Sequence, residues 1–416
     1  DTVCPHVHQS AYIHPYNNTH QILLHKLDPL PFRKSAPESP EHPLSLYQKL
    51  FPRFADCFYY LYCYQADLLT VMQHVLSQGQ THYNHFVGAV LITLVVLLIQ
   101  IGVVRILQRK RLAWALTFVP SALCLIMLTN IGVSPDSGML AFGVWRYIAP
   151  VLIVVFFLIV LGVNNSGVLD SLPRVWSNPI RELWLNLLIL TILMLTICFV
   201  SNDDKYFHAR IHAEQCLLDG DYDAALKTLR RYDVSDRNIS MLATYALAKK
   251  GELAEHMFDY PVVGVDAMLP NGKDIKFELY PEYQLYVYLG GRYKQTMNAR
   301  QYINFQRRIN RVNKPMADYV LCAHLFDRNL DAFVADLKKY YEVNDSVTLP
   351  RHYREALTLY MHTHTAPAII YKDNVGATDY EDYQLLERKF DNEHDKKNAL
   401  RRMFGNTYWY YYDYQR

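Results

Sequence analysis

The sequence lacks the short motifs that mark the common enzyme classes. It has no Walker loop, no G-x-S-x-G, no H-E-x-x-H and no dinucleotide-binding glycine run. Its seven cysteines include no C-x-x-C pair and no zinc-ligand spacing. The pair His362 and His364 has metal-compatible side chains, but it stands alone at the end of a weak helical pattern. We therefore predict no catalytic residue, no cofactor and no metal site.

An excess of charge of either sign is also missing. The 42 Lys and Arg side chains are balanced by 40 Asp and Glu, and no basic run stands out. Proteins that bind nucleic acid usually show such a run or stripe. Nucleic acid is therefore not expected as a partner.

Apolar residues, in contrast, are concentrated between positions 86 and 202. A helix needs about 20 apolar residues to cross a bilayer. Four stretches meet this length, and none contains Asp, Glu, Lys or Arg: 86–104, 112–135, 147–169 and 183–202. The sequence predicts a four-helix transmembrane domain over 86–202, with the lipid bilayer as its first partner. Because buried charge usually marks transport pathways, its absence argues against a pump or channel.

The basic residues of the connections predict how the spans are oriented. The first connection carries Arg105, Arg109, Lys110 and Arg111, and the third carries Arg174 and Arg181. The second connection has no Lys or Arg between 134 and 145, and Asp136 is its acidic residue. Lys and Arg are enriched in cytoplasmic loops. We therefore expect both flanking regions to be extracytoplasmic, which for a bacterial inner membrane means periplasmic. The first residue is Asp1 rather than Met, so we expect an upstream span or signal.

Two segments precede the first span. Residues 1–43 are rich in Pro and His and are expected to form a flexible segment. Residues 44–85 contain an amphipathic pattern over 44–78, with Lys49, Arg53, Asp56 and Asp67. These charges are too many for an ordinary span, so a helix lying at the membrane interface is predicted.

After the last span, residues 203–416 show helical periodicity broken by short polar turns. The segment 213–232 resembles a tetratricopeptide (TPR) repeat, with Gly220 at the turn, Tyr222 just after it and Ala225 at the close helix contact. Gly251 lies 31 residues after Gly220 and begins a second such turn. Gly291 and Asn329 occupy the equivalent positions of two more diverged units. The predicted fold class is therefore all-α, with four transmembrane helices followed by a TPR-like α-solenoid.

Two further segments of this half are candidate binding surfaces. An insertion over 260–282 carries Lys273 and Lys276, and insertions often mark the binding face of a solenoid. The chain ends in an aromatic run that includes Trp409 and Tyr411. This run could be a buried segment that caps the last repeat, or an exposed surface that binds a sugar ring or a partner.

The order of these features resembles a family of uncharacterised bacterial multi-pass membrane proteins with a C-terminal TPR-like region. The resemblance rests on HYNHFVGAVLITLV, HARIHAEQCLLDGDYDAALKTL and the terminal YWYYYDY. It implies an architecture and no activity. The expected function is that of a membrane-anchored scaffold that binds an envelope protein or peptide. The alternative is a fragment of a polytopic envelope glycosyl- or acyl-transferase, with Asp136 as its candidate acid.

Overall fold

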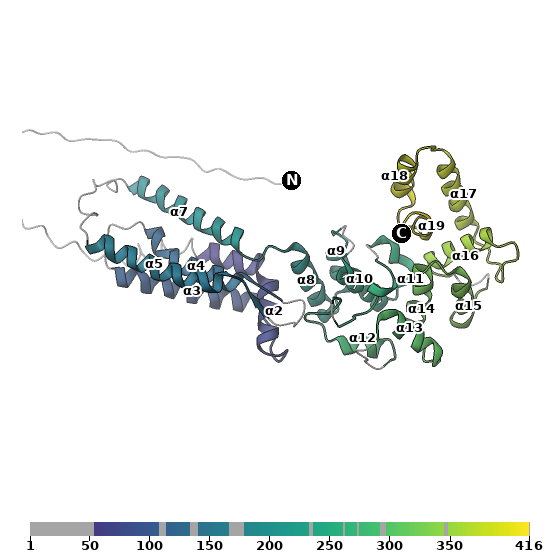
Figure 1. The fold of residues 1–416 in the computed structure, drawn as a ribbon, viewed down its shortest axis with the longest axis horizontal. Helices are drawn as coiled ribbons and strands as arrows, with labels where there is room; N and C mark the ends of the chain where they lie inside the picture. The colour runs from purple at the N-terminus through teal and green to yellow at the C-terminus, as the bar shows by residue number, and fades with distance from the viewer. Residues whose placement is uncertain are drawn as a thin grey trace, which may run out of the picture. The chain divides into compact units, whose positions relative to one another are not determined.

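The computed structural model describes nine stretches of the chain (Figure 1): 54–107, 114–133, 140–165, 179–232, 236–260, 263–272, 274–291, 297–344 and 348–415. Most of these residues are helical, and one short pair of strands interrupts the helices.

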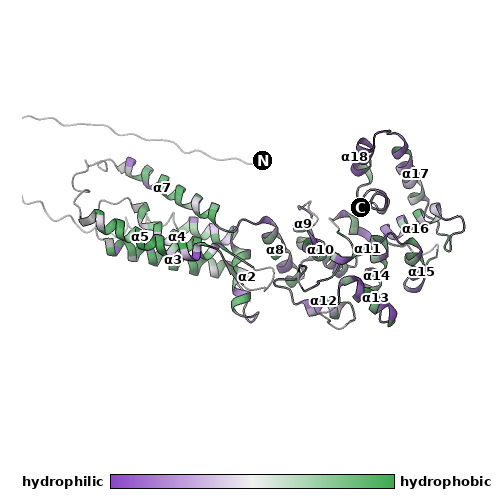
Figure 2. Ribbon diagram, viewed as in Figure 1, coloured by the Kyte–Doolittle hydropathy of each residue, from purple (hydrophilic) through white to green (hydrophobic). Residues whose placement is uncertain are grey.

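Three helices of the first half are long and apolar enough to cross a membrane. They are α3 (His85–Leu107), α5 (Trp145–Asn165) and α7 (Pro179–Val200). Most of their apolar side chains are exposed in the protein alone, and they colour this part of the molecule green in Figure 2. Such exposed apolar surface is suited to lipid. The first, third and fourth predicted spans are therefore confirmed as helices that could cross a membrane.

The second predicted span, 112–135, is wrong as a full-length membrane helix. In the described residues it contains a 3₁₀ turn (Trp114–Phe118) followed by α4 (Val119–Thr129), and the apolar helical run is Ala115–Thr129. At about 1.5 Å per residue this run is roughly 22 Å long, short of the ~30 Å hydrocarbon core. The chain then turns into a hairpin of β1 (Ile131–Val133) and antiparallel β2 (Leu140–Phe142).

The position of α4 explains why it can be short. It packs against α3, α5 and α7, and its buried residues include Pro120, Ser121 and Ile126. Asn186 on α7 and Asn202 just after it bind the backbone on either side of α4. Asn186 Oδ1 accepts the N–H of Ala115, in the preceding 3₁₀ turn, at 2.8 Å, and Asn202 Nδ2 donates to the carbonyl of Ile131, in β1, at 3.0 Å. These side chains therefore satisfy polar backbone groups next to α4, as backbone inside a membrane requires.

The segment before α3 forms two helices, not the single helix expected over 44–78. The first covers 54–63, the chain turns at Tyr64 and Gln65, and α2 covers Ala66–Leu76. Cys57, Leu61 and Leu69 are buried in the core of the apolar bundle. This segment is thus packed against the bundle, and α2 also contacts α8 (Lys205–Asp219). Residues 1–53 lie outside the described residues.

The second half is all-helical. Its first four helix pairs are α8 (Lys205–Asp219) with α9 (Tyr222–Leu229), α10 (Arg237–Lys250) with α11 (Leu253–His256), α12 (Glu282–Tyr288) with α13 (Ala299–Arg308), and α14 (Lys314–Phe326) with α15 (Leu330–Tyr340). Four helices complete it: α16 (Arg351–Thr363), α17 (Asn374–Arg388), α18 (Glu393–Phe404) and α19 (Tyr408–Tyr414).

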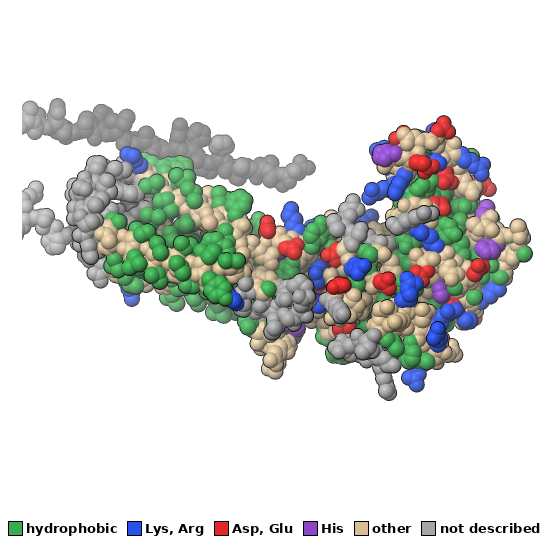
Figure 3. Space-filling model, viewed as in Figure 1, with side chains coloured by type: hydrophobic (Ala, Val, Ile, Leu, Met, Phe, Trp, Pro, Cys, Tyr) green, Lys and Arg blue, Asp and Glu red, His purple; other side chains and the backbone are tan. Residues whose placement is uncertain are grey.

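One hydrophobic core runs through this helical domain, from Ala213 on α8 to Tyr411 on α19. Tyrosines, phenylalanines and one tryptophan form much of it, and their rings meet edge to face or tilted. Charged side chains cover its surface, in contrast to the apolar surface of the bundle (Figure 3). The domain therefore has its own core and a water-compatible exterior.

Candidate ligand-binding cleft

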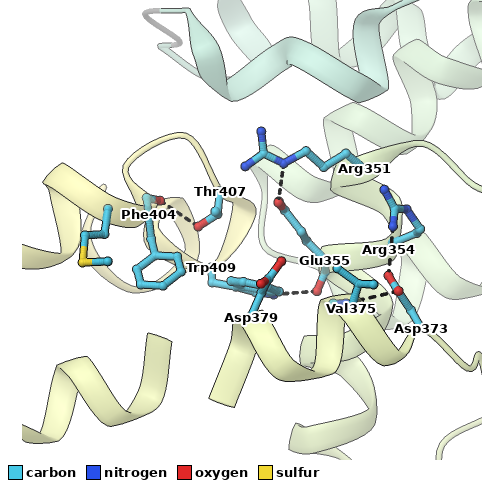
Figure 4. Close-up of a pocket in the computed structure, with 11 residues that line it drawn as sticks. Arg351, Arg354, Glu355, Asp373, Val375, Asp379, Phe404, Thr407 and Trp409 are labelled. Atoms are coloured by element: carbon cyan, nitrogen blue, oxygen red, sulfur yellow. Dashed lines mark hydrogen bonds and ion pairs between the residues drawn. The ribbon is translucent and has the colours of Figure 1, made fainter. Parts of the chain in front are cut away.

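A cleft lies between α16, α17 and the turn that joins α18 to α19. Its volume is about 280 Å³. Arg351, Arg354 and Glu355 line it from α16, and Asp373, Val375 and Asp379 line it from the start of α17 (Figure 4). The other wall is apolar and consists of Met403, Phe404 and Trp409. Charged and apolar side chains thus meet in one cleft.

The start of α16 places its three charged side chains on one face. Residues three or four apart are neighbours on a helix surface. Arg351 Nε donates to Glu355 Oε1 at 2.8 Å, and Arg354 Nη1 contacts Asp373 Oδ2 at 3.2 Å. Asp373 also caps α17, because its Oδ1 accepts the Gly376 N–H at 3.1 Å. These bonds hold the polar wall of the cleft in one arrangement.

Glu355 connects this wall to the C-terminal aromatic helix. Its Oε2 accepts the Tyr408 N–H at 2.7 Å, and His352 Nδ1 lies 2.9 Å from the same oxygen. Its backbone carbonyl accepts the Trp409 indole N–H at 2.8 Å. Glu355 and His352 are both buried. Because buried polar groups must be paired, these bonds fix α19 against α16.

Asp379 is the carboxylate of the cleft that is open to solvent. No hydrogen bond or ion pair to it occurs among the described residues, and it lines the same cleft as the Trp409 ring (Figure 4). Met403 and Val375 are also exposed, with 68% and 67% of their surface accessible. An aromatic ring next to a carboxylate attracts a cation, and the exposed apolar side chains suit an aliphatic stem. The cleft therefore matches a lysine or arginine side chain of a ligand.

The sequence did not single out Arg351, Arg354, Glu355 or Asp379. Arg351, Arg354 and Glu355 come from one helix and Asp379 from the next, and their charges look ordinary in the sequence. The available signal was the R-x-x-R-E pattern directly after Pro350, which places three charges on the first turn of a helix.

The four residues proposed from sequence for partner binding have different surroundings. Trp409 and Tyr411 are buried, as a capping segment requires, although Trp409 also lines the cleft. Lys276 is largely covered, and its Nζ lies 3.5 Å from Glu278 Oε1. Lys273 lies outside the described residues. Of the three described residues, Trp409 lines the cleft, whereas Lys276 and Tyr411 do not.

The repeat positions lie where helices turn or touch. Gly220 and Gly251 have φ of 77° and 76°, and each follows directly after its helix. This left-handed conformation favours glycine. Gly291 lies against α13, since an added Cβ would be 1.8 Å from Tyr302 Oη. Ala225 is fully buried, and Tyr222 packs at the edge of the same core.

His362 and His364 contact different residues. His362 Nδ1 is 2.9 Å from the Thr358 carbonyl, whereas His364 Nε2 is 3.2 Å from Asp331. The described part of the chain contains no group of three or more His, Cys, Asp or Glu that could hold a metal ion. Asp136 lies outside the described residues.

One buried carboxylate was not anticipated. Glu214 on α8 is inaccessible to solvent and accepts the N–H groups of Glu278, Leu279 and Tyr280 at 2.8, 2.6 and 3.0 Å. It thereby ties the insertion to α8. Burial raises the pKa of Glu214 to about 7, although the three N–H donors act in the opposite direction.

Together these features define a class: an α-helical protein with candidate membrane-spanning helices and a separate helical domain that carries a mixed polar and apolar cleft. Residues 133–291 and 292–415 match the model described as Family of unknown function (DUF6057). The match covers more than half of the chain, which therefore belongs to this family. It agrees with the resemblance to an uncharacterised family and assigns no activity. Comparisons with curated proteins and with solved structures give no match.

Proposed function

We propose that this protein is a membrane-anchored interaction protein whose helical domain binds a protein or peptide outside the cytoplasm. The observation that carries the proposal is the cleft at α16, α17 and α19. Its polar wall is fixed by paired charges, while Asp379, Met403 and Val375 remain exposed. A preorganised wall with exposed mixed side chains is suited to recognising a peptide segment.

The proposed location of the domain rests on the helix directions. Ser121 on α4 bonds to the Val96 carbonyl of α3, and Thr117 lies near Gln100, so these helices run in opposite directions. The contacts of Ala115 and Ile131 with α7 make α4 and α7 parallel. Although α4 is short, the chain therefore crosses the bundle four times, and Arg105 and Arg181 lie at the end opposite to α8. The positive-inside rule then favours an extracytoplasmic domain.

We further infer that α8–α9, α10–α11, α12–α13 and α14–α15 are TPR-like units. Left-handed glycines or Arg328 lie at the turns that follow α8, α10, α12 and α14. Repeats of this kind stack in series and often bind extended peptides. The solenoid-like pairs would present the terminal cleft to a partner in the cell envelope.

The ligand segment proposed for the cleft carries a basic residue beside an apolar one. The basic group would lie between Asp379 and the Trp409 ring, and the apolar group against Met403. Such a cation next to an aromatic face contributes about 0.5–1 kcal/mol at an exposed site. We therefore expect a weak, peptide-level interaction rather than a permanent complex.

Photo-crosslinking in cells tests this proposal. A photoreactive amino acid at Met403 should give a covalent adduct with a defined partner, and Asp379→Lys in the same chain should reduce that adduct at least severalfold. The matched control places the photoreactive amino acid at Leu385 on α17, which is exposed like Met403 but does not line the cleft. Equal adducts from both positions, or an adduct at Met403 that Asp379→Lys leaves unchanged, would contradict the assignment of the cleft.

A further inference from the structure

An apolar groove opens between α3 and α4 on the surface of the bundle. Its volume is about 720 Å³. Leu91 and Val95 form one wall, Cys124 and Leu128 form the other, and Met72 of α2 borders it. Leu91 and Val95 are more than half exposed in the protein alone. The groove is therefore open to the surface that the bundle presents to lipid.

A positively charged side chain lies at one end of this groove. Arg146, in the first turn of α5, is the one charged side chain among the described residues that line it. It is exposed, and its guanidinium lies 4.4 Å from the centre of the Tyr147 ring. Arg146 lies at the same end of the bundle as Ile131, which also lines the groove and contacts the end of α7. This is the end that leads into α8.

Physical chemistry decides what can occupy such a groove. An acyl chain gains no hydrophobic free energy when it moves from bilayer lipid to an apolar wall, because both environments are equally apolar. An unfilled hollow, however, loses dispersion contacts on both walls. An acyl chain will thus fill the groove, and the preference of the site for one lipid over another depends on the headgroup. A planar guanidinium binds a phosphate through two parallel hydrogen bonds.

We propose that the groove holds an acyl chain of an anionic phospholipid, with the headgroup phosphate against Arg146. The lipid comes from the leaflet on the side of α8. A zwitterionic lipid also has a phosphate, but its ammonium group cancels the net charge that Arg146 attracts. This lipid site is separate from the cleft of the helical domain and does not depend on the function proposed for that cleft.

The full chain in vesicles of equal phosphatidylglycerol and phosphatidylcholine provides the test. After mild detergent extraction, native mass spectrometry counts the lipids that remain bound. We expect the wild type to retain phosphatidylglycerol over phosphatidylcholine by roughly three- to tenfold, the effect of one cation near the membrane surface. Arg146→Gln should remove the preference, Arg146→Lys should keep part of it, and Arg181→Gln at the opposite end of the bundle should leave it unchanged.

Substitutions that fill the groove test whether the acyl chain lies there, independently of the charge of the headgroup. Val95→Phe and Cys124→Phe place a ring in the groove from opposite walls and should lower the retained lipid severalfold, whatever its headgroup. Leu158→Phe is the matched control, because Leu158 is exposed on α5 and lies outside the groove. All variants should elute as monodisperse folded protein.

Three results would overturn the proposal. The first is an unchanged headgroup preference in Arg146→Gln. The second is full lipid retention in both groove-filling variants. The third is a lipid-free dimer of the wild type, which would show that a second copy of the chain occupies the groove.

Discussion

Single buried side chains fix the relative positions of segments that are far apart in the sequence. Glu214 joins the insertion to α8, and Glu355 joins α19 to α16. Asp336 is fully buried between Arg307, His324 and Lys339, whose charges and hydrogen bonds keep the pKa of its carboxyl below the usual value despite burial. Removing one partner of such a group leaves an unpaired charge or donor, so these sites are sensitive to substitution.

Glu214 predicts a pH dependence of stability. Its pKa is about 7 in the folded protein and near 4.5 in an unfolded chain, so the folded state binds the proton more tightly. Its contribution to stability is therefore full below about pH 4.5 and is lost as the pH rises through 7. The shift corresponds to about 3 kcal/mol. Between pH 4.5 and 8, the unfolding free energy of the wild type should therefore fall by about this amount relative to that of Glu214→Gln. Denaturation in detergent measures both values.

The control for this experiment is Glu252→Gln. The Glu252 carboxylate is 40% exposed and pairs with Lys250 at 2.7 Å, so its removal should not add a comparable pH-dependent difference. If Glu214→Gln and the wild type follow parallel pH profiles, the three N–H donors keep the Glu214 carboxylate ionised and the burial argument is wrong.

At the scale of helices, the length and apolarity of a segment predicted the three long apolar helices. They did not predict helix boundaries that depend on contacts with distant residues. The predicted spans that correspond to α3, α5 and α7 are continuous apolar runs with few buried side chains, so their pattern is local. The segment 112–135 has the same apolarity, but Asn186 and Asn202 from distant positions bind its backbone on either side of α4. A sequence window over 112–135 contains neither residue. Its true boundaries were therefore not predictable from that window.

The contact between α8 and α9 predicts a second substitution effect. Ala225 is fully buried between these helices and the α10 core. Ala225→Trp should overpack the contact and lower the unfolding free energy by roughly 1–3 kcal/mol or more. Lys227→Trp adds the same ring to an exposed position of α9 and should change stability little. Similar denaturation midpoints for the two variants would show that the pair does not pack as a close helix–helix unit.

At the scale of the whole molecule, the candidate cleft could not be predicted because no local pattern marks it. Its residues come from α16, α17, α18 and α19, and folding brings Asp379 close to Trp409 across 30 positions of the sequence. The aromatic terminus did indicate a packed or binding segment. It could not indicate that Glu355 would bind it, since the Tyr408 N–H and the Trp409 indole both pair with the same residue 53 or 54 positions away.

The last prediction concerns the topology of the whole chain. If the bundle crosses the membrane four times, the helix at 54–63 and the helical domain lie on one side, and the start of α7 lies on the other. Tyr59→Cys and Leu385→Cys, both at exposed positions, should therefore gain label from a membrane-impermeant maleimide in spheroplasts. Arg181→Cys should gain label only after the membrane is permeabilised. Each gain is measured against the wild type, because Cys63 is already exposed.

The short helix α4 makes this experiment decisive. If α4 did not complete a crossing, three spans would place position 59 and position 385 on opposite sides, and only one of them would be labelled in spheroplasts. The basic residues at the ends of α3 and α7 favour the four-crossing arrangement, because Arg105 and Arg181 then share the cytoplasmic side. Label at Arg181→Cys before permeabilisation would reverse the orientation, and the cleft at α16, α17 and α19 would then face the cytoplasm.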